Sequence, residues 1–303
     1  MKKALALLVV PLALGTAALV WSLRSGPPLP QGLAGAIVFV SDRDGIPALY
    51  WRRLPRERSR RLTFGSEPAS DPAVSPDGTR VAFALNGRLA VVAVATAEAH
   101  VLTLGVDWKD AQPAWLPDGR RLVVSARRRT GEPAGLHLLE PALDGSLARS
   151  PLTRPSAGDD TAPAPLPDGS AIVFVREERL MRVELADGRV RRLTGGFKRD
   201  RAPRVLPSGR IACAWSEGKR HGIDTLDADG RARETLVEGG RFYRTLAASP
   251  DGRFLVATLG YDMGFHPLQA LLGRRSEALQ LLDARGQDQG VLETAARSGD
   301  WAR

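Results

Sequence analysis

Short apolar runs separated by turn residues occupy most of the chain. Residues 71–103 show the pattern clearly, since two apolar runs there are separated by the tight turn Asn86-Gly87 and preceded by Pro76-Asp77-Gly78. Runs of about four to eight residues bounded by such turns are typical of antiparallel β-strands joined as hairpins. The segment therefore predicts four strands, placed around Ala73 and at residues 80–85, 88–94 and 100–103.

The four-stranded unit repeats along the chain. The turn Pro-Asp-Gly, once replaced by Pro-Ser-Gly, recurs at about 40- to 50-residue steps, at Pro76, Pro117, Pro167, Pro207 and Pro250. A second mark keeps the same phase: Leu-Thr, weakened in the last two copies, begins at Leu62, Leu102, Leu152, Leu193, Leu236 and Leu292. Copies of one antiparallel unit at this period predict an all-β fold, a β-propeller of four-stranded blades stacked face to face.

The two ends of the repeat region complement each other. Residues 36–63 supply only the second, third and fourth strands of a blade, and the chain ends at residues 298–303 with a short segment that has no blade of its own. We expect this last segment to be the innermost strand of the first blade, which closes a ring of six blades and leaves no open sheet edge.

An aspartate recurs three residues before the proline that opens an innermost strand. These aspartates are Asp110, Asp160 and Asp200, and Asp300 resembles them in the last segment. The favoured interpretation is structural, with each carboxylate accepting backbone hydrogen bonds at the turn into the strand. The alternative is an acidic collar at one mouth of the central channel, able to bind a cation or a basic peptide.

The repeats resemble those of TolB-like six-bladed propellers. The resemblance is carried by residues 37–45, Leu49-Tyr50, Arg60-Thr63 and Pro72-Gly78, and it covers residues 36–303. TolB itself has an additional α/β domain before its propeller, which we do not expect here because a spacer leads directly into the first blade. The resemblance implies a fold far more strongly than a function.

The N-terminal region has the pattern of an export signal. Lys2 and Lys3 precede an uncharged apolar stretch, residues 4–23, and the three prolines of residues 25–35 predict an extended spacer. Small residues suited to cleavage are present, yet the stretch is also long enough to span a bilayer. Residues 1–24 are therefore expected to be a signal peptide or a membrane anchor, with residues 36–303 on the periplasmic side of the inner membrane.

Composition narrows the classes of partner and cofactor. The formal charge of +9 comes from arginines scattered through every repeat, and no basic stripe with interleaved aromatics occurs, so we expect no nucleic-acid partner. The single cysteine, Cys213, excludes an internal disulfide and falls at a core position of its strand. Membrane contact is expected only through residues 4–23, and the ring is expected to be a monomer.

Motifs for catalysis were sought and not found. The sequence contains no Gly-x-Ser-x-Gly elbow, phosphate loop or dinucleotide fingerprint. The four histidines form no metal spacing, although His221 and His266 both lie between the second and third strands of their blades. TolB-like propellers that act as oligogalacturonate lyases use a His-containing metal site, so the resemblance keeps a metal-dependent polysaccharide lyase or hydrolase as the alternative. We expect no metal and no cofactor.

Loop length distinguishes the two faces of the expected ring. The Pro-Asp-Gly face is uniformly short, whereas the two longest loops, residues 127–135 and 260–277, both join second and third strands on the opposite face. The expected binding residues on these loops are Arg127, Arg128, Arg129, Tyr261, Asp262, Phe265, His266, Arg274 and Arg275. The alternative is that residues 265–272 form a short helix that only plugs the channel. The sequence thus favours an exported, non-catalytic propeller that binds another envelope protein or peptide segment.

Overall fold

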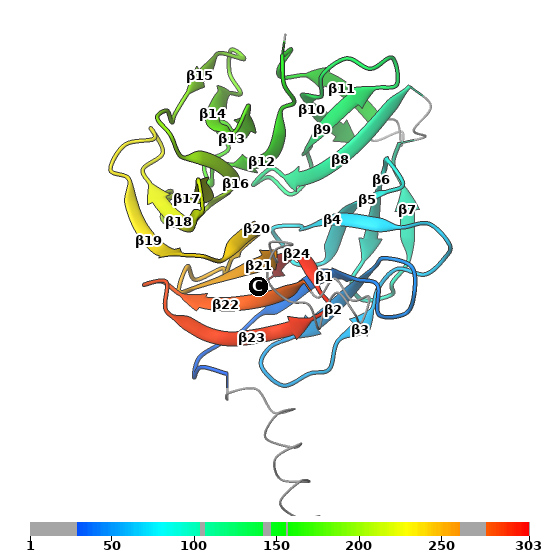
Figure 1. Ribbon diagram of the computed structural model, residues 1–303. Coiled ribbons are helices and arrows are strands. Elements are labelled where there is room, and N and C mark those ends of the chain that lie inside the picture. Colours follow the sequence, from blue (N-terminus) through cyan, green and yellow to red (C-terminus); the bar gives the residue numbers. More distant parts are fainter. Residues whose placement is uncertain (1–28, 104–106, 142–146, 156, 261–276, 303) are drawn as a thin grey trace, which may run out of the picture.

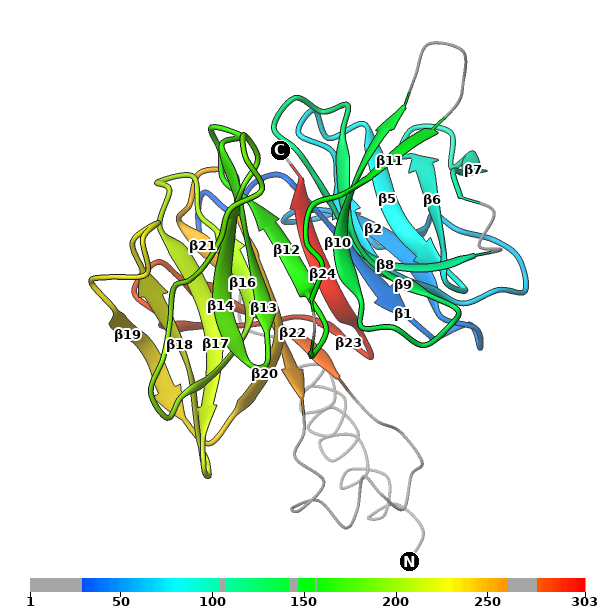
Figure 2. The ribbon, with the colours of Figure 1, turned by 90° about the horizontal axis from the view of Figure 1, so that it is seen from above.

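The computed structural model describes residues 29–103, 107–141, 147–155, 157–260 and 277–302 (Figure 1). These residues form six antiparallel sheets of four strands each, arranged as blades around a central channel (Figures 1 and 2). The prediction of an all-β propeller with six blades is confirmed. Residues 1–24, the expected signal peptide or membrane anchor, lie outside the described ranges. Within those ranges the structure contains no helix that is long and apolar enough to cross a membrane.

The blades are numbered in chain order, and the strands of each blade are given from the channel outward. Blade 1 contains β24 (Arg297–Ala302), β1 (Ala36–Ser41), β2 (Ala48–Arg53) and β3 (Arg60–Arg61). Blade 2 contains β4 (Ala69–Val74), β5 (Arg80–Leu85), β6 (Arg88–Ala93) and β7 (Ala99–Val101). Blade 3 contains β8 (Trp108–Trp115), β9 (Leu122–Arg128), β10 (Gly135–Pro141) and β11 (Leu147–Pro151).

The remaining three blades follow the same order from the channel outward. Blade 4 contains β12 (Thr161–Pro165), β13 (Ala171–Arg176), β14 (Arg179–Glu184) and β15 (Val190–Arg192). Blade 5 contains β16 (Arg199–Val205), β17 (Ile211–Glu217), β18 (Arg220–Leu226) and β19 (Glu234–Gly239). Blade 6 contains β20 (Phe242–Ala248), β21 (Phe254–Gly260), β22 (Ala278–Asp283) and β23 (Asp288–Thr294).

The hydrophobic core lies between blades rather than within one layer. Each apolar cluster joins two neighbours: Phe83 of blade 2 packs with strands of blade 1, and Phe174 of blade 4 packs with strands of blade 3. Cys213 is fully buried between blades 4 and 5, as expected of a core residue, and burial raises the pKa of its thiol. Since a single blade has two apolar faces, only stacking in a ring covers both.

The C-terminal strand closes the ring. β24 pairs antiparallel with β1, with Ala302 opposite Ala36 and Trp301 opposite Ile37. The indole Nε1 of Trp301 donates a hydrogen bond to the Ala34 carbonyl (3.2 Å), and its ring is buried between blades 1 and 6. The prediction that the end of the chain supplies the innermost strand of blade 1 is therefore confirmed.

The Leu-Thr mark has a structural explanation. In four blades the threonine hydroxyl accepts a hydrogen bond from the backbone N–H of a leucine on the third strand, at 2.8 to 3.0 Å, in the pairs Leu49 with Thr63, Leu89 with Thr103, Leu136 with Thr153 and Leu180 with Thr194. Thr194 also donates to the carboxylate of Asp200 (2.6 Å) in the next blade, as Thr153 does to Asp160. The Leu-Thr pair therefore lies at the end of a blade, and the hydroxyls of Thr153 and Thr194 link their blades to the next one.

Candidate functional site

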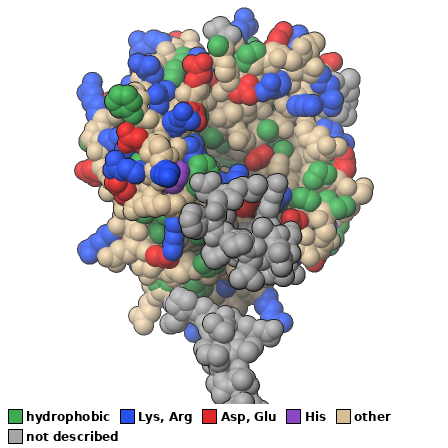
Figure 3. All heavy atoms as spheres, viewed as in Figure 1, with side chains coloured by type: hydrophobic (Ala, Val, Ile, Leu, Met, Phe, Trp, Pro, Cys, Tyr) green, Lys and Arg blue, Asp and Glu red, His purple; other side chains and the backbone are tan. Residues whose placement is uncertain are grey.

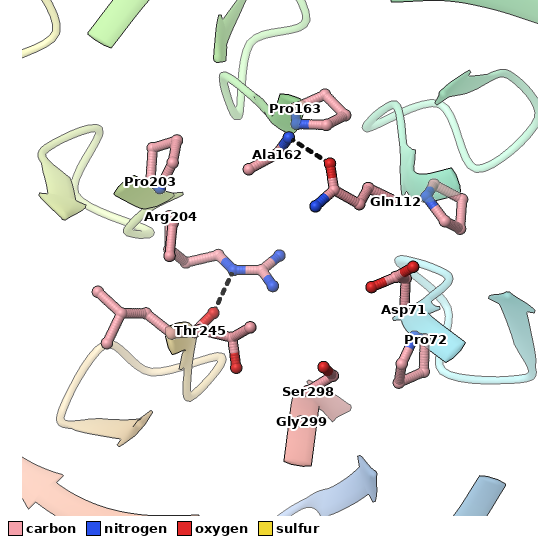
Figure 4. Close-up of a pocket in the computed structure, with 13 residues that line it drawn as sticks. Asp71, Pro72, Gln112, Ala162, Pro163, Pro203, Arg204, Thr245, Ser298 and Gly299 are labelled. Carbon is pink, nitrogen blue, oxygen red and sulfur yellow. Dashed lines mark hydrogen bonds between the residues drawn. The ribbon is translucent and has the colours of Figure 1, made fainter. Parts of the chain in front are cut away.

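A bulge in every innermost strand shapes the central channel. The pairing register of the innermost strand with its neighbour shifts at one point in each of the six blades. Five of the bulged residues have left-handed backbone conformations, with φ between 48° and 52°: Asp71, Gln112, Ala162, Ala202 and Ser298. With Thr245 of blade 6 they line a channel cavity of about 90 Å³ (Figure 4). A bulge redirects a side chain, which is how these strands place six equivalent residues around one axis.

Two of the bulged side chains satisfy the backbone of the following blade. The Gln112 amide oxygen accepts a hydrogen bond from the Ala162 N–H (2.8 Å; Figure 4). The Asp71 carboxylate accepts one from the Gln112 N–H. Burial raises the pKa of Asp71, and the hydrogen bonds from Ser70 and Gln112 with the charge of Arg297 only partly oppose this. The channel thus holds a carboxyl group that is easier to protonate than a free aspartate.

Arg204 and Asp300 each follow the left-handed residue of their own strand, Ala202 or Ser298, by two positions. The Nε of Arg204 donates to the Leu246 carbonyl (3.1 Å), and its Nη2 lies 3.4 Å from the Asp300 carboxylate. That carboxylate also accepts a hydrogen bond from the Val74 N–H (2.8 Å). Asp300 follows the left-handed Ser298 by two residues, whereas Asp160 precedes the left-handed Ala162 by two. Asp300 is therefore not equivalent to Asp110, Asp160 and Asp200, as the sequence had suggested. It lies four residues further along its strand than they do.

Asp110, Asp160 and Asp200 lie in the interior and pair with arginines. Their side chains are buried, and each accepts two hydrogen bonds from one guanidinium, in the pairs Asp110 with Arg149, Asp160 with Arg176 and Asp200 with Arg233. Asp160 also accepts a hydrogen bond from the Thr153 hydroxyl, and Asp200 accepts one from the Thr194 hydroxyl. Carboxylates held this way have neutralised charge and no free face toward the channel. This geometry fits a structural role rather than an open acidic collar, but the donors are arginine and threonine side chains and not the backbone N–H groups expected from the sequence.

Three arginines gather at one mouth of the channel. The residue just before each bulge is Ser70, Ala111, Thr161, Arg201, Arg244 or Arg297, so the arginines come from the neighbouring blades 5, 6 and 1. We call Arg201, Arg244 and Arg297 the arginine crescent. It lies where innermost strands begin, on the same face as the loops between second and third strands, which we call the loop face.

The charge of the arginine crescent is only partly compensated. Arg244 and Arg297 have side chains 54% and 36% exposed, and their carboxylate neighbours lie at 3.1 Å for Glu277 to Arg244 and at 3.8 Å or more for Arg297. Arg201 stacks over the Phe242 ring (4.3 Å) and donates to the Ser216 hydroxyl (2.6 Å). Its Nη1 has no hydrogen-bond partner among the residues that the structure describes. The crescent thus combines two partly exposed guanidinium groups, those of Arg244 and Arg297, with that of Arg201, whose Nη1 is buried.

Of the binding residues predicted on the long loops, only the three of blade 3 are described. Arg127 forms an ion pair with Asp159, and Arg128 stacks over the Trp108 ring (5.1 Å). The backbone N–H of Arg129 donates to the Asp107 carbonyl (3.0 Å). The blade 6 residues Tyr261, Asp262, Phe265, His266, Arg274 and Arg275 lie outside the described residues. The long blade 3 loop therefore has a defined structure, and the blade 6 part of the prediction stays a prediction.

The histidines inside the described ranges lie apart. His100 is exposed on β7, His137 is buried on β10, and His221 lies edge-on to Phe242 near the start of β18. Over these ranges the structure shows no group of three or more His, Cys, Asp or Glu side chains placed to hold a metal ion. Lys and Arg side chains are scattered around the face seen in Figure 3 rather than collected in one patch.

Comparison with known proteins shows similarity to TolB. No family model matches the chain. A TolB homologue from Chlorobium luteolum is 30% identical over 141 residues, which is 46% of this chain and 31% of that protein, so the chain spans about a third of that relative's length in the match.

Solved structures extend the similarity to nearly the whole chain. TolB from Acinetobacter baumannii superposes with a TM-score of 0.70 at 16% identity, covering 93% of this chain and 70% of that one. A putative TolB from Agrobacterium tumefaciens gives 0.65 at 18% identity, covering 90% and 100%. An oligogalacturonate lyase in complex with manganese gives 0.61 at 16% identity, covering 84% and 73%, which at that identity shows the shared fold alone. This chain is therefore a six-bladed β-propeller that is similar to a TolB homologue in sequence over part of its length and to TolB structures in fold over nearly all of it.

Proposed function

We propose that this chain is an exported, non-catalytic propeller that binds another protein of the bacterial envelope. The arginine crescent carries the proposal, because the partly exposed and partly compensated guanidinium groups of Arg244 and Arg297, with Arg201 beside them, form a surface for an acidic segment of a partner. The similarity to TolB supports an envelope setting. The partner we infer is a peptide segment rich in Asp or Glu, bound across the loop-face mouth.

The spacer gives this proposal a direction. Arg253, next to the blade 6 Pro-Asp-Gly turn, donates a hydrogen bond to the Gly32 carbonyl (2.7 Å), and Leu33 is buried against blades 1 and 6. The chain therefore reaches the ring on the Pro-Asp-Gly face. If residues 4–23 are retained as an anchor, that face is held toward the membrane and the loop face is presented to the periplasm. Fractionation with the inner membrane, with the propeller open to periplasmic protease, is the expected result.

The proposal is tested by removing charge from one face at a time. The double variant Arg244→Ser with Arg297→Ser weakens the crescent, and the matched control Arg120→Ser with Arg285→Ser removes two exposed arginines from turns on the opposite face. We expect the first variant to lose about tenfold in capture of its envelope partner at physiological salt, since about 1.4 kcal/mol corresponds to a factor of ten. The control should capture as the wild type does. Equal capture by both variants would refute the crescent as the binding surface.

A further inference from the structure

Blade 3 contains a cleft that is separate from the channel. Its volume is about 500 Å³, and its walls include Trp108, Arg128, His137, Arg149 and Arg154. Two guanidinium groups lie over the Trp108 ring, those of Arg128 and Arg149, each 5.1 Å from its centre, and the imidazole of His137 meets the ring edge-on at 4.6 Å. A cleft of this size can hold a small ligand or a side chain with its neighbours.

Two polar groups in this cleft lack partners. His137 is 7% exposed, and its Nδ1 has no hydrogen-bond partner among the described residues. The same holds for Nη1 of Arg149, whose Nη2 donates to both oxygens of Asp110 (2.9 and 2.8 Å). Buried donors and acceptors are satisfied in most folded proteins, so two orphans beside one cleft indicate a missing partner.

Blade 5 shows what such a partner looks like. The buried Asp200 is held by Arg233 there, as Asp110 is held by Arg149 in blade 3. Asp224 pairs with Cys213 across the sheet at the strand position where His137 pairs with Val124 in blade 3. In blade 5, however, the Asp224 carboxylate accepts one hydrogen bond from Arg233 Nε (2.5 Å) and one from Lys198 (2.8 Å). In blade 5 a second carboxylate thus gives Arg233 a hydrogen-bond acceptor beyond Asp200, and all three of its nitrogens donate.

In blade 3 the corresponding position is a histidine, so Arg149 receives no second carboxylate from the described chain. The charged groups facing His137 are Arg149 on β11, Arg128 on β9 and Arg154 beyond β11, with Glu132 on the loop wall. Burial first, and then the charges of these arginines, lower the pKa of His137 to about 4. The cleft therefore carries an excess of positive charge beside a neutral imidazole, which is the arrangement that an added carboxylate would stabilise.

We propose that the blade 3 cleft binds a carboxylate ligand, whose oxygens take the place that Asp224 fills in blade 5 and accept hydrogen bonds from Arg149 Nη1 and His137 Nδ1. Trp108 forms the apolar wall against which the rest of the ligand packs. This inference is independent of the arginine crescent, because none of Arg201, Arg244 and Arg297 lines the cleft.

The direct test follows the His137 imidazole by NMR during titration of the wild-type protein. Three probes are compared: glutarate, the peptide Ac-Gly-Glu-Gly-NH2 and the uncharged peptide Ac-Gly-Gln-Gly-NH2. We expect saturable shifts of the His137 signals with one or both of the acidic probes, and none with the glutamine peptide. Saturation should also raise the titration midpoint of His137, because a bound carboxylate favours the imidazolium. Glutarate without the glutamate peptide would identify a free acid as the ligand, and the reverse would identify a peptide side chain.

A substitution supplies the missing carboxylate from the chain itself. His137→Asp should weaken binding of the acidic probe at least tenfold while keeping the melting temperature at or above that of the wild type, because the new carboxylate pairs with Arg149. The matched control is His100→Asp, the same change at an exposed histidine, which should leave binding unaltered. Wild-type binding by a folded His137→Asp protein would overturn the proposal. If that variant does not fold, the wild-type titration decides, and unmoved His137 signals with both acidic probes overturn it.

Discussion

At the scale of single residues, His137 stands where blade 5 has Asp224. Its imidazole is buried among arginines, and its pKa is lowered from 6.5 to about 4, mainly by burial. The unfolded chain, in which this histidine titrates normally, therefore binds more protons than the folded chain between these two values. By linkage, the contribution of His137 to stability is lost as the pH falls through this window.

The lowered pKa of His137 predicts how the pH dependence of stability changes in the variant His137→Gln. Between pH 7 and pH 5 the wild type should lose about 1–2 kcal/mol of unfolding free energy more than the variant, which has no group to protonate. Urea unfolding at both pH values measures this difference. The same change at the exposed His100 should leave the pH dependence of the wild type unaltered, and a His137→Gln protein with wild-type pH dependence would show that the imidazole titrates normally in the folded state.

At the scale of elements, much of the architecture was readable from the sequence. The Pro-Asp-Gly and Leu-Thr marks predicted the blades, and the tight turn expected at Asn86-Gly87 is present, with φ of 51° and 81°. The fourth strand of blade 1 is shorter than expected, since β3 contains only Arg60–Arg61. Strand and turn signals are local, which is why they survive without knowledge of the tertiary structure.

The bulges were not readable, and the candidate site depends on them. A bulge alters which side chains face the channel, but it leaves the apolar and polar pattern nearly unchanged. Arg201 and Arg244 each precede the Pro of the following turn by six residues, yet only the bulge explains their position at the mouth. Asp300 was misplaced for a related reason, because no Pro-Asp-Gly turn follows β24 to fix its register.

The Leu-Thr attachment between blades can be tested with a matched pair. Thr194→Val removes the acceptor of the Leu180 N–H and the donor to Asp200, and both groups are buried. Thr63→Val removes only the acceptor of the Leu49 N–H, because Ala69 takes the place of the aspartate in blade 2. Leaving buried polar groups unsatisfied costs about 1–3 kcal/mol each, so Thr194→Val should destabilise the protein more. Equal losses in chemical unfolding would contradict a role for the carboxylate in joining blades.

At the scale of the whole molecule, closure depends on a segment of few residues. Trp301 is 7% exposed and packs between blades 1 and 6, so Trp301→Ala should lower the unfolding free energy by about 3–5 kcal/mol. Deleting residues 298–303 also removes the hydrogen bonds of β24 and leaves β1 as an open edge, so we expect aggregation. Solubility and thermal melting check both variants, and wild-type behaviour of the deletion would contradict closure by β24.

The central claim is that a protein partner binds at the loop-face mouth of the ring. A photo-crosslinking residue tests it most directly when placed at either end of one blade, at Thr161 beside the channel mouth or at Asp168 in the Pro-Asp-Gly turn of the same blade. After illumination of intact cells, we expect one crosslinked envelope protein from Thr161 and none from Asp168. Crosslinks to that partner from Asp168 alone would place the binding surface on the opposite face and contradict the account.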